Sequence, residues 1–416
     1  MTKQELPELL VIGDSLTLET GFARVLRSLV PRFAEHYRIS EWAIGYSGWP
    51  HNLPYRLFPT TGFPGGNHWQ HSLPTLLRSI PMLKPECVFM LNDPWLFSVD
   101  FMSKFKEACL KANPKCKIVF YCPVDSWLNP ADVTGLKLAD AVVAYTHYGA
   151  AKLLEAGIEA DFVIPHGVDT SIYRPLENRD EVRARVFGGW LNPQDTLITY
   201  VGAHSRRKAW WTVMEAFAEM LAQTSAWPGV TPKLLMHMDP VDESEGTNAF
   251  AVAHQLGLTP DKLLLPQEWF RKGGMPLVTE SGLNEIYNAT DVFMTCTLGE
   301  GWGLPIVEAL AAGVPNVFVP DHSACTEICD TLNGFGDYRI RKLPMSDQSI
   351  VLSNDNSRVR RQVASQFAAE LVLRSQMRSQ TEPETARTGL NTNTISEGWL
   401  SWDRIAKEFL NIMKSK

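Results

Sequence analysis

The stretch T-L-G-E-G-W-G-L-P-I-V-E-A-L-A-A-G-V-P, residues 297–315, decides the fold assignment. It follows the apolar run 292–295 and opens a helical pattern at Leu304, which Gly313 and Pro315 end. A strand that turns through glycines into a helix is the unit of a parallel α/β sheet. Ligands bind at the carboxyl ends of such strands, and the positive end of the helix suits a diphosphate. The stretch therefore predicts a phosphate-binding turn in a Rossmann-like domain, although its glycines alone could simply permit a tight turn.

The same alternation of apolar runs and helical patterns extends along the chain. Short apolar runs occupy residues 9–13, 87–91, 117–121, 141–145, 197–201, 234–238, 263–265, 292–295 and 317–319. Helical patterns lie between them, for example at 21–35, 103–112, 210–222, 283–289 and 304–312. Continuous apolar strands separated by helices indicate parallel sheets that are covered on both faces. We therefore expect an α/β protein with two such sheets.

The two series of strands and helices meet in the segment I-P-H-G-V-D-T-S-I-Y-R-P, residues 164–175, whose prolines and glycine interrupt both periodicities. We expect one domain over 1–168 and a second over 169–396. A helical apolar stripe then resumes near the end of the sequence, at Trp399, Trp402, Ile405, Ala406, Phe409, Leu410 and Met413. This closing helix, within 397–416, must bury its stripe against another element.

Composition excludes several classes of protein. The chain has 416 residues, 45% of them hydrophobic and 20% charged, with a formal net charge of −7. This predicts a globular protein without the global basic field of nucleic-acid binders. The N-terminus lacks the pattern of a signal peptide, and no run is long enough to span a membrane, so we expect a cytoplasmic protein. The seven cysteines suit buried reduced thiols, and we predict no metal site and no cofactor.

A second loop carries clustered positive charge. The segment V-G-A-H-S-R-R-K-A-W, residues 201–210, again lies between an apolar run and a helical pattern. Arg206, Arg207 and Lys208 could form a solvated surface, but their place at a strand end favours contact with a diphosphate. Glu300 and Glu308, before and within the helix of the first stretch, suit hydrogen bonds to hydroxyl groups.

Together these segments resemble the retaining GT-B glycosyltransferases, the broad family of mannosyl-, glucosyl- and sucrose-type transferases. The resemblance rests on the glutamates 300 and 308 within the glycine-rich stretch, on the R-R-K loop, and on the segment 164–175, so it covers most of residues 160–330. It implies two Rossmann-like domains that face each other across a cleft. It also implies that the closing helix crosses back and completes the N-terminal domain, and that the C-terminal domain holds a nucleotide-diphosphate sugar.

The resemblance also implies roles for individual residues. Glu300 matches a glutamate expected near the anomeric face and hydroxyls of the donor sugar, and Glu308 matches one expected on the ribose. Lys208 matches a diphosphate-binding lysine. The family often has an arginine where this chain has Ala203, so Arg206 or Arg207 must supply that charge. The backbone around the sugar and diphosphate would come from Gly301, Trp302, Gly303 and Leu304, with Trp302 in place of a commoner phenylalanine.

The N-terminal half gives weaker signals. Gly21 lies in a loop after the first apolar run and resembles the family's first glycine loop, although a helix N-cap explains it equally well. Asn92, Asp93 and Asp125 follow apolar strands on the side where ligands bind. We expect Asn92 and Asp93 in the acceptor site. Asp125 is the candidate for contact with the acceptor or the reacting centre, with an Asx turn as the alternative.

Residues 46–75 form an aromatic segment rich in glycine and proline, too long for a routine connection. Its Trp49 and His51 are expected to contact the acceptor, although an ordered structural loop would explain the segment as well. Arginines at 358, 360, 361, 374 and 378 could track an acidic polymer, but we expect a solvated helix there.

We therefore predict a glycosyltransferase that moves a sugar from a nucleotide-diphosphate donor to an acceptor hydroxyl, with retention. The acceptor is left open between a glycan, a small molecule, a lipid-linked compound and a nucleic-acid base. The alternatives are a transferase that acts on modified bases of nucleic acid, a nucleotide-sugar epimerase of the same fold, and a non-enzymatic sugar-binding protein. A closing sugar-binding protein would have no use for the R-R-K loop.

Overall fold

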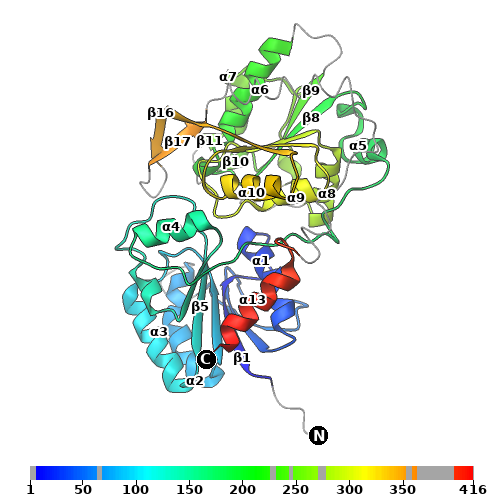
Figure 1. Cartoon of the computed structure of the whole chain (residues 1–416). Coiled ribbons are helices and arrows are strands. Elements are labelled where there is room, and N and C mark those ends of the chain that lie inside the picture. Colours follow the sequence, from blue (N-terminus) through cyan, green and yellow to red (C-terminus); the bar gives the residue numbers. More distant parts are fainter. Residues whose placement is uncertain are drawn as a thin grey trace. The chain divides into compact units, whose positions relative to one another are not determined.

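The computed structural model describes residues 6–62, 68–224, 231–242, 247–269, 278–352, 358–362 and 398–415. The chain divides into two compact units (Figure 1). Unit 1 comprises residues 1–167 and 397–416, and unit 2 comprises residues 168–396. Each unit is built on its own parallel sheet with helices on both faces. The predicted α/β class with two Rossmann-like sheets is confirmed.

Unit 1 holds seven parallel strands in the order β3-β2-β1-β4-β5-β6-β7. The strands are β1 (Glu8–Asp14), β2 (Arg38–Ile44), β3 (Arg56–Pro59), β4 (Cys87–Leu91), β5 (Lys117–Cys122), β6 (Ala141–Ala144) and β7 (Phe162–Val163). The helices are α1 (Gly21–Phe33), α2 (Leu73–Leu83), α3 (Val99–Ala112), α4 (His147–Glu155) and α13 (Trp402–Lys414). Short 3₁₀ turns occupy Trp69–Ser72 and Thr134–Leu138.

Unit 2 holds six parallel strands in the order β12-β9-β8-β13-β14-β15. The strands are β8 (Thr196–Val201), β9 (Pro232–His237), β12 (Leu263–Leu264), β13 (Val292–Met294), β14 (Asn316–Pro320) and β15 (Ile340–Leu343). The helices are α5 (Arg179–Phe187), α6 (Trp210–Thr224), α7 (Ala249–Gln255), α8 (Glu280–Ala289), α9 (Leu304–Ala311) and α10 (Ser323–Gly334). Short 3₁₀ turns occupy Gly188–Trp190, Arg206–Lys208 and Gln267–Trp269. Two hairpin pairs complete the unit, β10 (Val241–Asp242) with β11 (Thr247–Asn248), and β16 (Met345–Leu352) with β17 (Arg358–Gln362).

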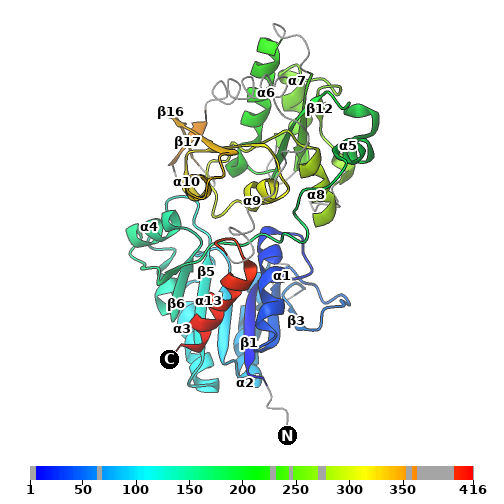
Figure 2. The same ribbon diagram turned by 45° about the vertical axis from the view of Figure 1, so that its right-hand side comes forward.

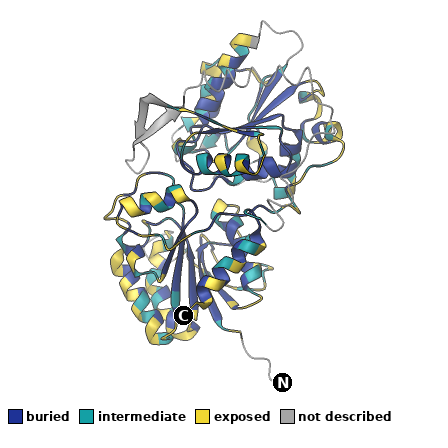
Figure 3. Cartoon of the chain, viewed as in Figure 1, coloured by how far each residue is buried: buried dark blue, intermediate teal, exposed yellow. Residues whose placement is uncertain are grey.

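Alternate residues of the unit 1 strands pack on opposite faces, as expected for a sheet buried on both sides. The side chains of Ile12, Met90 and Phe120 enter a core shared with α2 and α3. On the other face Phe89 contacts Phe33 of α1 and Phe409 of α13, with ring centroids 5.3 and 5.1 Å apart. Figure 3 shows the result, with buried strands in both units and exposed residues on the outer sides of the helices.

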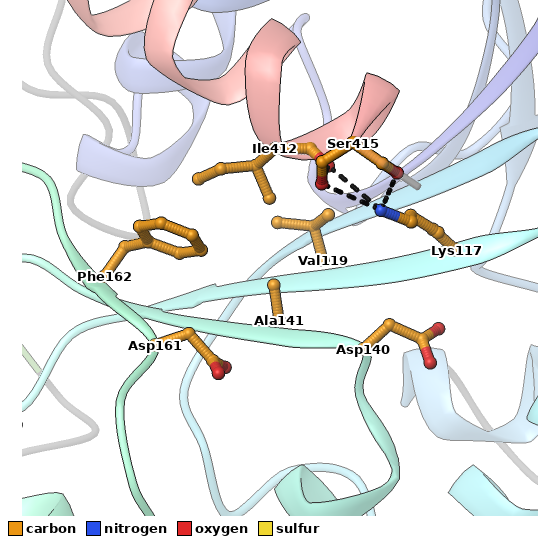
Figure 4. Close-up of a pocket in the computed structure, with 8 residues that line it drawn as sticks. All are labelled: Lys117, Val119, Asp140, Ala141, Asp161, Phe162, Ile412 and Ser415. Atoms are coloured by element: carbon orange, nitrogen blue, oxygen red, sulfur yellow. Dashed lines mark hydrogen bonds between the residues drawn. The ribbon is translucent and has the colours of Figure 1, made fainter.

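The closing helix α13 lies beside α1 in unit 1 (Figure 2). Its predicted stripe is buried from Trp402 to Met413. Arg32 of α1 donates to Asp403 at 2.6 Å, and Lys117 at the start of β5 donates to the Ser415 hydroxyl at 2.9 Å (Figure 4). The small pocket of Figure 4 therefore lies between the end of α13 and the amino-terminal starts of β5 and β6, at the edge opposite to the predicted ligand sites.

Two expectations about individual segments need correction. The segment 46–75 is not one loop, because it contains β3 and a 3₁₀ turn and ends inside α2; residues 63–67 lie outside the described part. The arginine-rich stretch does not form a helix at its start, because residues 358–362 pair with β16 as strand β17. Arg374 and Arg378 lie outside the described residues.

All seven cysteines are buried free thiols, as the sequence predicts. No helix in the described part of the chain combines the length and apolar character that a membrane crossing requires.

Candidate functional site

The R-R-K loop and the glycine-rich stretch meet in unit 2, at the carboxyl ends of β8 and β13. Lys208 Nζ donates to both carboxylate oxygens of Glu300, at 2.6 and 2.7 Å. Arg207 Nη1 lies 3.4 Å from Glu300 Oε2 and also donates to the carbonyl of Gly299. Two cations and one carboxylate, far apart in the sequence, therefore form one cluster.

The backbone fixes the two loops to each other. Leu298 N–H donates to the carbonyl of Arg207 at 2.7 Å, and the Thr297 hydroxyl donates to the same carbonyl at 3.2 Å. Glu300 N–H donates to the hydroxyl of Ser323, the first residue of α10, at 2.9 Å. Ser323 has a left-handed backbone, with φ of 52°, which is uncommon for a residue other than glycine. The position of Glu300 thus depends on Thr297 and Ser323. Neither was predicted as a site residue, although Thr297 opens the glycine-rich stretch; Ser323 belongs to no recognisable motif.

The cluster keeps Glu300 ionised despite its burial. Glu300 is 8% exposed. Burial on its own raises the pKa of this carboxyl. The positive charges of Lys208 and Arg207 and their hydrogen bonds lower the pKa by more than burial raises it, so the net shift is downward. The cluster thus brings two cationic side chains to one carboxylate. Such a site at the carboxyl edge of a parallel sheet is suited to an anionic group.

The glycine-rich turn leads directly into α9. Gly303 is the N-cap of α9 and has φ of 101°, a backbone conformation that favours glycine. A Cβ atom at Gly303 would lie 2.8 Å from Cδ1 of Ile306, so a side chain there would also clash. Gly301 is buried, Trp302 is 3% exposed and Leu304 is half-buried. Trp302 is therefore mainly a packing residue of this turn.

Glu308 lies on α9 and is 2% exposed. Its Oε2 accepts a hydrogen bond from the hydroxyl of Tyr287 on α8, at 3.1 Å. Glu300 thus lies in the turn before α9 and is bonded to Lys208, whereas Glu308 lies within α9 and is bonded to Tyr287.

The remaining positions of the R-R-K loop differ in their surroundings. Arg206 is exposed, whereas Arg207 is part of the cluster with Glu300. His204 is buried; one ring nitrogen lies 2.6 Å from the carbonyl of Asp239 and the other lies 2.7 Å from the hydroxyl of Thr247. Ala209 ends the 3₁₀ turn in a left-handed conformation, with φ of 43°. Arg207 is therefore better placed than Arg206 to share a ligand with Lys208.

In unit 1, the first loop forms a helix cap. The Thr20 hydroxyl accepts from Ala23 N–H at 3.2 Å and donates to Asp14 at 2.6 Å, and Gly21 is the exposed first residue of α1. Burial raises the pKa of Asp14, which the Thr20 hydrogen bond partly offsets. Thr20 is thus the N-cap of α1, in agreement with the alternative that the sequence suggested for this loop.

The predicted acceptor residues lie at the carboxyl edge of the unit 1 sheet, after different strands. Asn92 follows β4, is 3% exposed, and accepts from Asp93 N–H at 2.8 Å. Asp125 follows β5 and is half-buried; the Ser126 hydroxyl donates to it at 3.2 Å. Burial, and then the charge of Asp125, raises the pKa of Tyr148 on α4, so Asp125 lies close to this helix.

Trp49 and His51 lie in the loop after β2. Trp49 is 75% exposed, and its carbonyl accepts a hydrogen bond from the Tyr46 hydroxyl. The His51 ring contacts the Tyr46 ring at 5.7 Å in an edge-to-face arrangement. Tyr46 thus orders this loop and leaves the Trp49 side chain in solvent.

The sequence analysis missed two buried polar groups at the same edge. Glu41 of β2 is fully buried and accepts from Leu16 N–H through one oxygen at 3.0 Å. Tyr145, directly after β6, is 2% exposed, and its hydroxyl has no hydrogen-bond partner among the described residues. Tyr145 ends the apolar run 141–145, which indicates only a strand, and Glu41 lies in a segment where no apolar run was predicted.

Across the described residues, no group of three or more His, Cys, Asp or Glu side chains is placed to hold a metal ion.

Comparison with known proteins finds sequence similarity to glycosyltransferases. No family model matches the chain. A D-inositol 3-phosphate glycosyltransferase of Rhodococcus erythropolis is 28% identical over 159 residues, 37% of this chain and 31% of the relative. A protein of the same name from Nocardia farcinica is 27% identical over 228 residues, 54% of this chain and 47% of the relative. The chain thus spans less than half the length of these curated relatives.

Solved structures match over the full length. Anabaena HepE in complex with UDP and glucose superposes with a TM-score of 0.64 at 14% identity, covering 99% of this chain and 100% of that one. A glycosyltransferase from Rickettsia africae gives a TM-score of 0.68 at 13% identity, with 99% and 98% covered. A trehalose 6-phosphate synthase from Burkholderia multivorans gives 0.59 at 13%, with 98% of each chain covered. The chain therefore has the two-domain α/β fold of these proteins, and the predicted resemblance to GT-B glycosyltransferases is confirmed.

Proposed function

We propose that this protein is a glycosyltransferase that moves a sugar from a nucleoside-diphosphate donor to an acceptor hydroxyl, with retention at the anomeric carbon. The observation that carries the proposal is the cluster of Lys208, Arg207 and Glu300 at the carboxyl ends of β8 and β13. Arginine and lysine side chains at a strand end suit a diphosphate, and the sequence and fold similarities described above support the same chemistry.

In this proposal the cations act on the leaving group. Transfer releases a nucleoside diphosphate, so negative charge grows on its oxygens as the glycosidic bond breaks. Lys208 as a point charge and Arg207 through its guanidinium would stabilise that charge, and their bonds to Glu300 and to the Gly299 carbonyl place both cations near the strand ends before the donor binds. The proposal assigns this stabilisation to side chains and includes no cofactor.

Donor binding would redistribute the bonds of the cluster. A diphosphate that approaches Lys208 competes with Glu300, which engages Lys208 through both oxygens. One Glu300 oxygen would then be available to a hydroxyl of the donor sugar. Glu308, already bonded to the Tyr287 hydroxyl, would contact the ribose, and the backbone from Gly301 to Leu304 would contact the sugar and diphosphate.

The proposal gives the two units different tasks. Unit 2 would bind the donor, and the carboxyl edge of the unit 1 sheet would bind the acceptor through Trp49, His51, Asn92 and Asp93, with Asp125 near the reacting centre and the Gly21 loop toward the donor phosphate. That the two domains face each other across a cleft stays a prediction.

We also propose a cytoplasmic location. Its support is the set of seven buried free thiols, since reduced cysteines are typical of that compartment.

The test begins with the donor. The complex of HepE with UDP and glucose makes UDP-glucose the first compound to try, followed by other nucleotide sugars. We expect calorimetric binding and slow release of nucleoside diphosphate. Lys208→Ala and Arg207→Ala should each weaken binding by about 1.5–3 kcal/mol, because each removes a charge-assisted contact.

Lys262→Ala is the matched control, since Lys262 is a lysine of unit 2 directly before β12, whose ammonium lies 4.0 Å from the carboxylate of Asp261. Absence of binding by every nucleotide sugar would refute the proposal. An epimerized free donor, or glycosylated DNA, would instead favour one of the two enzymatic alternatives.

A further inference from the structure

Three exposed tryptophans lie at the carboxyl edge of the unit 1 sheet. Trp49, in the loop after β2, is 75% exposed; Trp95, after β4, is 41% exposed; and Trp127, after β5, is 50% exposed. No other tryptophan in the described ranges is as exposed. Because β2, β4 and β5 are parallel, their following loops lie at one edge of the sheet. Exposed indole rings on several loops of one sheet edge offer a ligand aromatic surface to pack against.

Polar groups that hydrogen-bond to hydroxyls lie in the same loops. Asp93 and Asn92 are beside Trp95, and Asp125 is beside Trp127. A sugar ring offers C–H groups on its faces and hydroxyls on its rim. Indole faces with neighbouring carboxylates and an amide therefore match both of its surfaces.

A buried and unsatisfied hydroxyl points to a ligand at this edge independently. Tyr145 follows β6, its ring packs against Tyr121 and His166 at 4.3 and 4.1 Å, and its hydroxyl has no partner in the described structure. Burial raises the pKa of Tyr145, and the charges of Asp93 and Asp14 raise it further. The Tyr145 hydroxyl is thus close enough to these carboxylates to feel their charge. It stays protonated and can donate a hydrogen bond to an oxygen of a bound ligand.

The same loops carry no lysine or arginine. Lysine and arginine are absent from residues 15–20, 45–55, 92–98, 123–133 and 145–146. The guanidinium of Arg27, in the second turn of α1, is already bonded to the carbonyl of Leu18 and, at 2.9 Å, to Glu19. A phosphorylated ligand needs arginine or lysine contacts, and carboxylates repel it.

We propose that the acceptor bound at this edge is a neutral, unphosphorylated saccharide whose ring stacks on Trp49, Trp95 or Trp127. This inference rests on the proposed function, because it names the acceptor class of the same enzyme. It selects against the phosphorylated sugars and polyols that a cationic acceptor site would favour. The carboxylates hydrogen-bond to sugar hydroxyls and exclude anionic analogues of the same sugar.

The experiment measures sugar binding to the full chain without donor. Saturation-transfer NMR with glucose, mannose and maltose is compared with glucose 6-phosphate and mannose 6-phosphate. We expect transfer to neutral sugars, strongest for maltose, and weaker transfer to each phosphorylated sugar than to its parent. Of the single variants Trp49→Ala, Trp95→Ala and Trp127→Ala, each that removes an indole on which the sugar stacks should lower affinity for the neutral sugars about two- to tenfold.

Phe162→Ala is the control, because Phe162 is an exposed aromatic residue of unit 1 that lines the pocket between β5, β6 and α13 rather than this edge. The Asp93→Asn and Asp125→Asn double variant should shift selectivity toward glucose 6-phosphate about two- to tenfold, since it removes two negative charges.

Two results would overturn the inference while leaving the proposed function intact. One is tighter binding of a phosphorylated sugar than of its parent by a protein that still binds nucleotide sugar. The other is the absence of neutral-sugar binding, or binding that none of the tryptophan variants weakens. Loss of nucleotide binding in the calorimetry would instead refute the proposed function, and this inference with it.

Discussion

Two buried glutamates, one in each unit, lie close to the carboxyl ends of parallel strands, and their surroundings differ. Glu300 of unit 2 is held by Lys208 and Arg207, and these cations leave its pKa lowered despite burial. Glu41 of unit 1 accepts only from the backbone of Leu16, and its second oxygen has no partner among the described residues. Burial and, less strongly, the charge of Asp14 raise the pKa of Glu41 to about 8.

The difference shows that two sheets of the same type can present different side chains in the loops after their strands, and so suit different ligands. Both units place a parallel sheet between layers of helices. Unit 2 supplies cations at the strand ends and so suits an anionic ligand. Unit 1 supplies carboxylates, an amide and indole rings there, and so suits hydroxyl groups.

The largest expected effect concerns the pH dependence of stability that Glu41 imposes. Its folded pKa of about 8 lies above the ordinary 4.5, so the folded state keeps a proton that the unfolded chain loses between these values. The stabilisation is complete below the lower value and decreases as pH rises. From about pH 5 to about pH 8 this contribution falls by up to about 4 kcal/mol, at 1.36 kcal/mol per unit.

The Glu41→Gln variant should lack this fall, since an amide does not titrate. Urea denaturation of both proteins across that range measures it as the difference between the two pH profiles. Parallel profiles would mean that Glu41 is ionised in the folded protein.

The next effect concerns Glu300, the buried glutamate that is bonded to Lys208. Glu300→Ala removes the carboxylate that positions Lys208 and Arg207 beside the proposed reacting sugar. We expect turnover to fall by about 10²–10³-fold, the usual cost of losing one preorganised electrostatic group. Steady-state kinetics measures it.

Glu285→Gln is the control for Glu300, because Glu285 is a partly exposed glutamate of α8 that pairs with Arg185. Wild-type turnover in Glu300→Ala would remove Glu300 from the proposed chemistry.

A smaller effect tests the turn that carries Glu300. Gly303→Ala places a Cβ atom 2.8 Å from Ile306 at a φ of 101°, which should destabilise unit 2 by about 1–3 kcal/mol. Gly189→Ala is the matched control, since nothing lies within 4 Å of a Cβ atom there and its φ is not in the left-handed range. Equal denaturation midpoints for the two variants would contradict the strain at Gly303.

The smallest effect separates the two edges functionally. Asp125→Asn and Trp49→Ala should leave nucleotide affinity unchanged while lowering transfer by about tenfold or less, because both residues belong to unit 1. Nucleotide affinity, donor hydrolysis and transfer are measured on the same two proteins. If both variants lose nucleotide binding while folded, the donor contacts have been assigned to the wrong unit.

The apolar strands could be predicted from sequence because they are buried on both faces. The run 87–91 is β4 to the residue, and the run at 9–13 differs from β1 by one residue at each end. Strand β2 escaped prediction because Arg38, Ser40 and Glu41 interrupt its apolar pattern, although Ser40 and Glu41 are fully buried. The Ser40 hydroxyl bonds to Glu8 and one Glu41 oxygen accepts from Leu16, and a local pattern does not contain these distant contacts.

Helix α2 was missed for a different reason. It contains Pro74 and Pro81, residues that normally indicate turns or helix ends. Pro74 lies in the first turn, where a missing N–H costs nothing, and helix packing against the sheet stabilises the rest.

The sequence allowed the main residues of the candidate site to be predicted, but not the contacts between them. The two loops each have a local signature, which identified Lys208 and Glu300 separately. Their pairing joins positions 92 residues apart, and only the order of β8 and β13 in the sheet brings them together. Ser323 is held in this site by its backbone conformation, which has no counterpart in the sequence pattern.

The position of α13 has a consequence for how the chain acquires its structure during synthesis. Unit 2 is continuous, whereas unit 1 needs residues 402–414 to cover Phe33, Phe89 and Tyr121. The unit made first on the ribosome therefore finishes folding last, and unit 2 can become native before its predecessor does. Until α13 emerges, the part of that sheet face which α1 does not cover is exposed to chaperones and proteases. A nascent chain arrested before residue 402 should thus be cut in unit 1 while unit 2 resists digestion.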